Sequence, residues 1–402
     1  MNRTNILSIL LVLCIGIMLT ANVSANQFEK TDNLDPFFVT IDSAELIASH
    51  YKQQIQTSVS DFSDWENAKI ECSSTLYDLE GNPTVYAFEV SDKKQYMGYM
   101  LISASKRNYP ILAFTKNEIP FENSEMKKKS IDSANQYMSK DTIEYESPKQ
   151  LYLGGTYYLE EYDLKDRNGM TKNKIIVDLI TGEAISSDEL DLFSNENDES
   201  LQYSDKEEIT VMWEELDAQI SSSALNSYSY LTYSVMDHKI AGVPYYDYYL
   251  GCTPTAAANV LGYWEGGSYS SLPEGDTLIS ELATEMYTDS DGVTYTPLID
   301  DGIEDVCSNH GYNNFDATND YYLSWSEVKS EIDSSRPFMI NMNSGGLASG
   351  RTQAYGQHSV ACTGYLDSTT DYVILHDGWS GTDDHYLIFG NWGVAVATWV
   401  RP

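Results

Sequence analysis

The sequence predicts an α+β protein of two domains behind an export signal. Three observations carry this prediction. Helix-like and strand-like patterns alternate from about Thr40 to Glu189, and beyond Ile240 three helical segments come first, before strands that begin after Pro337. Helices grouped apart from a run of strands are typical of an α+β layer arrangement. The 402-residue chain is also long enough for two separate cores.

Residues 1–25 are predicted to be a signal peptide. A short positive start (Met1–Arg3) precedes the apolar run Ile6–Leu19, and small residues follow at Val23–Ala25. This order is that of a secretory signal, and we predict cleavage after Ala25. The apolar run is short for a membrane span, which needs about 20 residues. We therefore predict an exported protein, extracellular or associated with the cell envelope, with no membrane span after signal removal.

Residues 26–189 are predicted to form a smaller α+β domain. One helix begins at Ile41, with Asp42 or Ser43 as its N-cap, and a second covers about Ser124 to Tyr137. Turn signals separate the strand-like runs. These runs are Val85–Val90, Tyr99–Ser103, Ile111–Phe114, Tyr152–Tyr158 and Lys174–Leu179. We find no candidate for chemistry in this domain.

Residues 190–239 are predicted to be an acidic linker rich in Ser and Tyr, with one helix at Glu207–Ile220. Such a composition favours exposure and proteolytic cleavage.

The last domain, residues 240–402, has predicted helices at Thr253–Tyr263, Thr277–Met286 and Ser326–Ile332. Its predicted strands are Phe338–Met342, Ser359–Tyr365, Tyr372–Leu375, Tyr386–Phe389 and Val394–Trp399.

Charge and cysteine content exclude some classes of protein. The net charge of −37 argues against a nucleic-acid partner, because phosphates require a basic surface. Four of the five cysteines remain after signal removal, too few for a disulfide-dense scaffold. Cys307 and Cys362 are a possible bridge, although the apolar surroundings of Cys362 favour a buried thiol.

Cys252 is the candidate nucleophile. It stands at the predicted start of the helix over Thr253–Tyr263, where Pro254 is tolerated in the first turn. The unpaired N–H groups and dipole of a helix N-terminus favour a thiolate over a thiol. Gly251 would leave room for a substrate carbonyl. A lone cysteine is more often a small buried hydrophobe, so this assignment depends on its partners.

His358 and Asp377 supply those partners. If Ser359–Tyr365 and Tyr372–Leu375 form a hairpin, His358 and Asp377 fall at the same end of it. We therefore predict that His358 is the general base and that Asp377 orients it. Nucleophile, base and orienting group together are typical of thiol catalysis.

The Gly251–Trp264 segment resembles the nucleophile helix of papain-like cysteine peptidases, and is most similar to the bacteriocin-processing and streptopain-like branches. Gly356–Val360 and Asp377–Gly381 resemble the histidine strand and the Asn/Asp-x-Trp segment of these families. Phe88–Val90 and Gly98–Phe114 are similar to streptopain-type propeptides. The resemblance implies a papain-like catalytic domain without a cofactor, peptide or protein substrates, Trp379 beside the substrate, and an inhibitory propeptide.

One position departs from that family. Papain-like enzymes usually place a Gln shortly before the cysteine, where its amide helps bind the oxyanion, and Tyr245–Leu250 holds no Gln or Asn. Tyr248, or Asp247 if protonated, is the substitute candidate, together with the Cys252 N–H. Two other functions stay open: a catalytically weak secreted binding or adhesion module on the same scaffold, and acyl transfer to an amine.

Two groups of acidic residues are candidate metal sites. Asp289–Gly292 with Asp300 has its Gly misplaced for an EF-hand, although a nonstandard calcium site stays open. A set of His376, Asp383, Asp384 and His385 fits no helical zinc spacing. We predict no metal.

Overall fold

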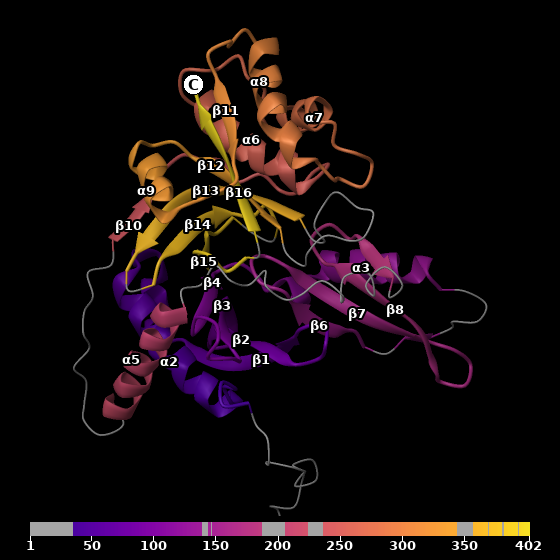
Figure 1. Cartoon of the computed structure of the whole chain (residues 1–402), viewed down its shortest axis with the longest axis vertical. Coiled ribbons are helices and arrows are strands. Elements are labelled where there is room, and N and C mark those ends of the chain that lie inside the picture. The colour runs from indigo at the N-terminus through magenta and orange to yellow at the C-terminus, as the bar shows by residue number, and fades with distance from the viewer. Residues whose placement is uncertain are drawn as a thin grey trace, which may run out of the picture. The chain divides into compact units, whose positions relative to one another are not determined.

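Figure 1 shows a computed structural model of the chain. It describes residues 35–138, 144–145, 147–186, 206–223, 236–343, 357–368, 370–379, 382–392 and 394–402. The predicted signal peptide and much of the predicted linker lie outside these ranges. Residues 39–402 form one compact unit. Within the described residues, no helix combines the length and apolarity needed to cross a bilayer.

One large sheet runs through this unit. Its described part has 16 strands, in the order β11-β16-β12-β13-β14-β15-β4-β3-β2-β1-β6-β7-β8-β9, with β10 beside β13 and β5 beside β7. The strands of the first half are β1 (Lys69–Tyr77), β2 (Pro83–Asp92), β3 (Gln95–Ser103), β4 (Ile111–Thr115), β5 (Glu144–Tyr145), β6 (Lys149–Tyr152), β7 (Tyr158–Lys165), β8 (Thr171–Asp178) and β9 (Ala184–Ser186). Those of the second half are β10 (Met236–Lys239), β11 (Asp316–Asp320), β12 (Phe338–Asn343), β13 (Gln357–Asp367), β14 (Tyr372–His376), β15 (His385–Ile388) and β16 (Val394–Arg401).

Helices flank this sheet, so that the chain is mixed α and β as predicted. They are α2 (Ile41–Ser58), α3 (Ser124–Gln136), α5 (Lys206–Ser223), α6 (Cys252–Glu265), α7 (Gly275–Glu285), α8 (Ile299–Asn309) and α9 (Trp325–Asp333). In Figure 1, α6, α7 and α8 are grouped together above the C-terminal strands, and α2 and α5 lie side by side. Helix α6 packs on β12 and β13 through buried small residues such as Ala257 and Ala258.

Two sequence-based expectations are corrected, and some elements were missed. The cap of α2 is Thr40, whose side chain accepts a hydrogen bond from the Ser43 N–H, rather than Asp42 or Ser43. The stretch Tyr152–Tyr158 is the connection between β6 and β7 instead of a strand, because positive φ values at Gly154 and Gly155 turn the chain there. The strand β1 and the elements α8 and β11 were not predicted.

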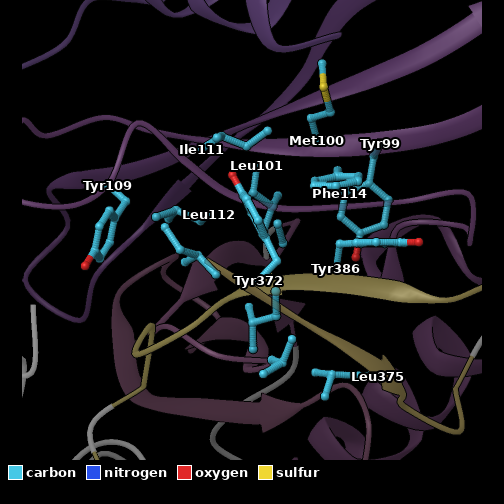
Figure 2. Packing of buried hydrophobic residues seen from close by; sticks show 14 of the residues in the cluster. Tyr99, Met100, Leu101, Tyr109, Ile111, Leu112, Phe114, Tyr372, Leu375 and Tyr386 are labelled. Atoms are coloured by element: carbon cyan, nitrogen blue, oxygen red, sulfur yellow. The ribbon is translucent and has the colours of Figure 1, made fainter. Parts of the chain in front are cut away.

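The two halves of the chain meet where β4 pairs antiparallel with β15. Phe114 stands opposite Tyr386 in this ladder, and their rings stack with centroids 4.7 Å apart. Figure 2 shows both rings inside a cluster that β3 residues such as Tyr99 share with Tyr372 and Leu375 of β14. The sheet and much of its core are therefore continuous from the first half to the second. The division of this unit into a propeptide-like and a catalytic domain stays a prediction.

Candidate active site

Cys252 is the first residue of α6, as predicted. Its N-cap is Gly251, which supplies no side-chain cap and has φ of 137°, a value that favours glycine. A Cβ at Gly251 would lie 2.6 Å from the carbonyl oxygen of Gly292, so no side chain fits there. The Cys252 side chain therefore stands beside uncapped N–H groups of a helix terminus. Cys252 is 7% exposed.

His358 lies at the start of β13 and is fully buried. The side chains of His358 and Cys252 shift each other's pKa, which indicates that they lie close together. The Nε2 atom lies 3.0 Å from Oδ2 of Asp178, and Nδ1 has no hydrogen-bond partner among the described residues. The fold brings Cys252 and His358 together, while their catalytic roles stay predictions.

The surroundings favour an ion pair of thiolate and imidazolium. Burial raises the pKa of the Cys252 thiol, but the hydrogen bond and charge of His358, the Ser359 backbone and the Thr253 hydroxyl outweigh burial and leave this pKa lowered. Burial lowers the pKa of His358, while the Asp178 carboxylate and the Cys252 sulfur raise it well above its usual range. Both shifts increase the nucleophilic form of the sulfur.

Asp178 is the site residue that the sequence analysis missed, and it comes from the half of the chain in which no candidate for chemistry was found. It ends β8 and is 6% exposed. Its Oδ1 accepts hydrogen bonds from the backbone of Ile180 at 2.8 Å and of Thr181 at 3.3 Å. The turn after β8 thus fixes one oxygen and aims the other at His358. No local sequence pattern links two residues 180 positions apart.

Further residues of the first half cover the imidazole. The Tyr157 ring lies 4.6 Å from the His358 ring in an edge-to-face arrangement, and the Tyr157 hydroxyl donates to the carbonyl of Met342 at 2.6 Å. On another side, the Trp379 ring lies 5.4 Å from that of His358. His358 therefore has no exposed surface, and Cys252 has little.

Asp377 lies at the same end of the β13–β14 hairpin as His358, and the hairpin itself is as predicted. The Asp377 carboxylate forms its hydrogen bonds with residues other than His358. Its Oδ2 lies 3.0 Å from Nδ1 of His385 on β15, and its Oδ1 accepts from the Tyr245 hydroxyl and from the Trp379 N–H. The Nε2 atom of His358 is bonded to Asp178 instead, so an orienting role for Asp377 stays a prediction.

The oxyanion candidates fall in different surroundings. Tyr248 is half-buried, and its pKa is raised first by burial and then by the charge of Cys252. Its hydroxyl lies so close to Gly292 that a Cβ there would be 2.9 Å from it, and Gly292 adjoins Gly251, the residue before Cys252. The Tyr248 backbone N–H donates to the Gly378 carbonyl at 2.8 Å. Asp247 is exposed. The Cys252 N–H and the Tyr248 hydroxyl are therefore the donors that this geometry favours for an oxyanion.

The remaining cysteines are free thiols, Cys307 and Cys362 included. Both are buried, and burial raises the pKa of each. They belong to different core clusters, so the bridge that the sequence left open is not formed.

The candidate calcium loop around Asp289 is held by its own backbone. The Oδ1 atom of Asp289 accepts hydrogen bonds from the N–H groups of Asp291 and Val293. Over the described ranges, no group of three or more His, Cys, Asp or Glu side chains is arranged to hold a metal ion.

Comparison with known proteins gives one family. Residues 237–399 match the model of the Peptidase_C39 like family. The matched segment contains Cys252, His358 and Asp377, whereas Asp178 lies outside it. No curated protein matches the chain. The family match supports a papain-like cysteine peptidase relationship, and with it hydrolysis of peptide bonds in protein substrates.

Proposed function

We propose that the chain is a secreted cysteine endopeptidase made as a zymogen. The observation that carries this proposal is the buried contact between Cys252, at the N-terminus of α6, and His358. A thiolate at a helix N-terminus beside an imidazolium is the arrangement of thiol catalysis. The family match over residues 237–399 supports the same reaction class.

In the proposed reaction, the Cys252 thiolate attacks the scissile carbonyl carbon and forms a C–S bond. The carbonyl oxygen becomes an oxyanion, which the Cys252 N–H and the Tyr248 hydroxyl stabilise. The imidazolium of His358 then protonates the leaving amine as the C–N bond breaks. In the second step of the reaction, neutral His358 takes a proton from water, whose oxygen attacks the acyl carbon. The C–S bond then breaks, which releases the carboxylic acid and restores the Cys252 thiolate. No cofactor takes part.

The zymogen part of the proposal depends on the first half of the chain. Asp178 and Tyr157 contact His358 directly, and the β4–β15 ladder attaches their half to the second. We expect a substrate to reach Cys252 only after displacement of the first half. Cleavage in the segment 224–235, which precedes β10, is the expected route.

The test is hydrolysis of casein by the full chain before and after limited proteolysis, with Cys252→Ser as the matched control. We expect no turnover before cleavage, turnover afterwards, and none from the variant in either state. Equal turnover by the cleaved parent and the cleaved variant would reject Cys252 as nucleophile. Equal turnover before and after cleavage would reject the zymogen but not the peptidase.

The second candidate is a secreted binding or adhesion module on a peptidase scaffold. The observation that favours it is the segment Tyr245–Leu250, which lacks the expected Gln and exposes Tyr249. Tyrosines are enriched at protein interfaces. Iodoacetamide labelling of the cleaved chain separates the two functions, because an activated thiolate reacts at neutral pH and an inert thiol does not. Unlabelled Cys252 in the cleaved chain would favour the binding module.

A further inference from the structure

A cavity of about 340 Å³ lies away from the Cys252 site. Asp371, just before β14, and Phe389, just after β15, line it, together with Trp325 of α9. Asp377 follows the opposite end of β14. Asp377 stands six positions after Asp371, which corresponds to about 20 Å along an extended strand. The cavity is therefore a second place where the fold could hold a ligand.

Aromatic rings form much of its wall. The Trp325 and Phe389 centroids are 5.2 Å apart, and those of Phe389 and Trp392 are 5.4 Å apart. Tyr321 and Tyr322 also line the cavity while remaining 50% and 84% exposed. Exposed tyrosines beside a row of partly buried aromatic side chains offer ring faces to a ligand. Such faces attract organic cations and also stack on sugars.

The charges around the cavity distinguish these two ligands. The carboxylates of Asp371 and Glu208 line it, and no Lys, Arg or His is among the described residues that do. Burial, followed by the negative charge of Asp367, raises the pKa of Asp371 to about 7; the Lys329 ammonium opposes this rise, and Glu208 adds a smaller increase. A cation in the cavity would relieve this repulsion, whereas a neutral sugar would leave it in place.

The chain itself shows this chemistry next to the cavity. The Lys329 ammonium lies 5.7 Å from the Trp325 ring centroid and 3.1 Å from Oδ2 of Asp367. The Lys329 ammonium is thus held between an aromatic face and a carboxylate. At its other rings, the cavity offers a cationic ligand the same two partners.

We propose that this cavity binds a small organic cation, of the quaternary ammonium or guanidinium class, with Asp371 as its counter-ion and Tyr322 as a ring at its mouth. The proposal is independent of the chemistry of Cys252. Ionisation of Asp371 makes the site pH-dependent. Because its carboxylate is charged above about pH 7, cation binding strengthens as the pH rises through neutrality, with Asp367, Glu208 and Lys329 as the neighbouring charges.

The experiment is calorimetric titration of the full chain carrying Cys252→Ser, which cannot digest itself. The probes are choline and its uncharged isostere 3,3-dimethylbutan-1-ol at 0.15 M salt, with cellobiose as the neutral sugar. We expect choline to bind at least tenfold more tightly than the isostere, and more tightly at pH 8 than at pH 6. Asp371→Asn should weaken choline binding about tenfold and remove its pH dependence. Tyr322→Ala should weaken it severalfold without affecting folding, because this side chain is 84% exposed.

Asp305→Asn is the matched control, since it removes one carboxylate from the exposed face of α8 and should leave choline binding unchanged. Three outcomes would overturn the proposal. They are equal binding of choline and its isostere, binding of cellobiose in preference to choline, and choline binding that Asp371→Asn and Asp305→Asn reduce alike.

Discussion

The Nε2 atom of His358 lies 3.0 Å from Oδ2 of Asp178, a carboxylate that stands 180 residues earlier in the chain. Both side chains are buried, and the other oxygen of Asp178 is held by backbone N–H groups. The half of the chain that closes the site thus also supplies the charge that keeps its histidine protonated. Closure of the site and protonation of its histidine in the full chain therefore depend on the same contact.

Asp178→Asn should lower the free energy of unfolding of the full chain by about 3 kcal/mol near pH 6, because a buried imidazolium loses its counter-charge. The raised pKa of His358 fixes the pH dependence. This contribution is complete below the unfolded pKa near 6.5 and is lost as the pH rises through the folded pKa near 10. Denaturant unfolding at pH 6 and pH 10 measures the difference.

Asp166→Asn is the control for Asp178→Asn. Asp166 also accepts hydrogen bonds from the backbone of its own turn, at Asn168 and Met170, without contacting a histidine. Its substitution should change stability much less than Asp178→Asn does. A loss of equal size in both variants, independent of pH, would show that the imidazole contributes nothing.

Asp377→Asn should destabilise the full chain by about 2 kcal/mol, because the carboxylate receives donors from Tyr245, Trp379 and His385. Tyr245→Phe removes one of these donors and should cost about 1 kcal/mol. The cleaved Asp377→Asn protein tests the catalytic role separately. If Asp377 orients His358 after activation, its turnover of casein should fall at least about a hundredfold, and unchanged turnover would leave Asp377 as a structural residue.

The thiols should react with iodoacetamide in a defined order. Cys307 and Cys362 are buried with raised pKa values, so they should become labelled only in denaturant. Cys252 should be protected in the full chain and become the fastest of the three after cleavage, because its pKa is lowered. Peptide mapping by mass spectrometry identifies each labelled residue. Labelling of Cys362 before Cys252 in the cleaved chain would contradict this order.

Glu331→Gln should destabilise the fold by about 3 kcal/mol. Glu331 is 4% exposed and pairs with both Arg336 and Arg401, at distances from 2.6 to 3.4 Å. Burial raises the Glu331 pKa, but the two guanidinium groups outweigh burial and lower it. The contribution is therefore present above about pH 4.5 and is lost as the pH falls through the folded pKa. Thermal unfolding at pH 7 and pH 3 should show a difference between parent and variant at pH 7 alone.

Phe114→Ala should weaken the attachment of the first half to the second. Phe114 is 1% exposed and packs on both Tyr386 and Phe62, so that truncation should cost about 3–5 kcal/mol. After cleavage, the variant should separate into two fragments on gel filtration at a lower denaturant concentration than the parent. Ile131→Ala is the control, because Ile131 lies on α3 with 40% of its surface exposed.

Many helices and strands of the second half could be predicted because the sequence patterns that specify them are local. The pattern of apolar residues after Gly251 sets helix α6. The turn residues Asp367–Asp371 between two apolar runs set the β13–β14 hairpin, and together these elements bring Cys252 and His358 into place. Asp178 could not be found, since its role depends on a turn docking onto a distant strand. The region Tyr152–Tyr158 misled the prediction because β-favouring tyrosines surround the two glycines that turn the chain.

The ladder between β4 and β15 also affects whether the two fragments self-associate once the chain is cut. While the halves stay together, each of these strands satisfies the other's backbone groups. Departure of the first half would uncover two sheet edges at once, each flanked by aromatic rings, and such edges recruit further strands. We therefore expect the liberated segments to self-associate through these edges unless a loop, a substrate or a second protein takes the vacated position.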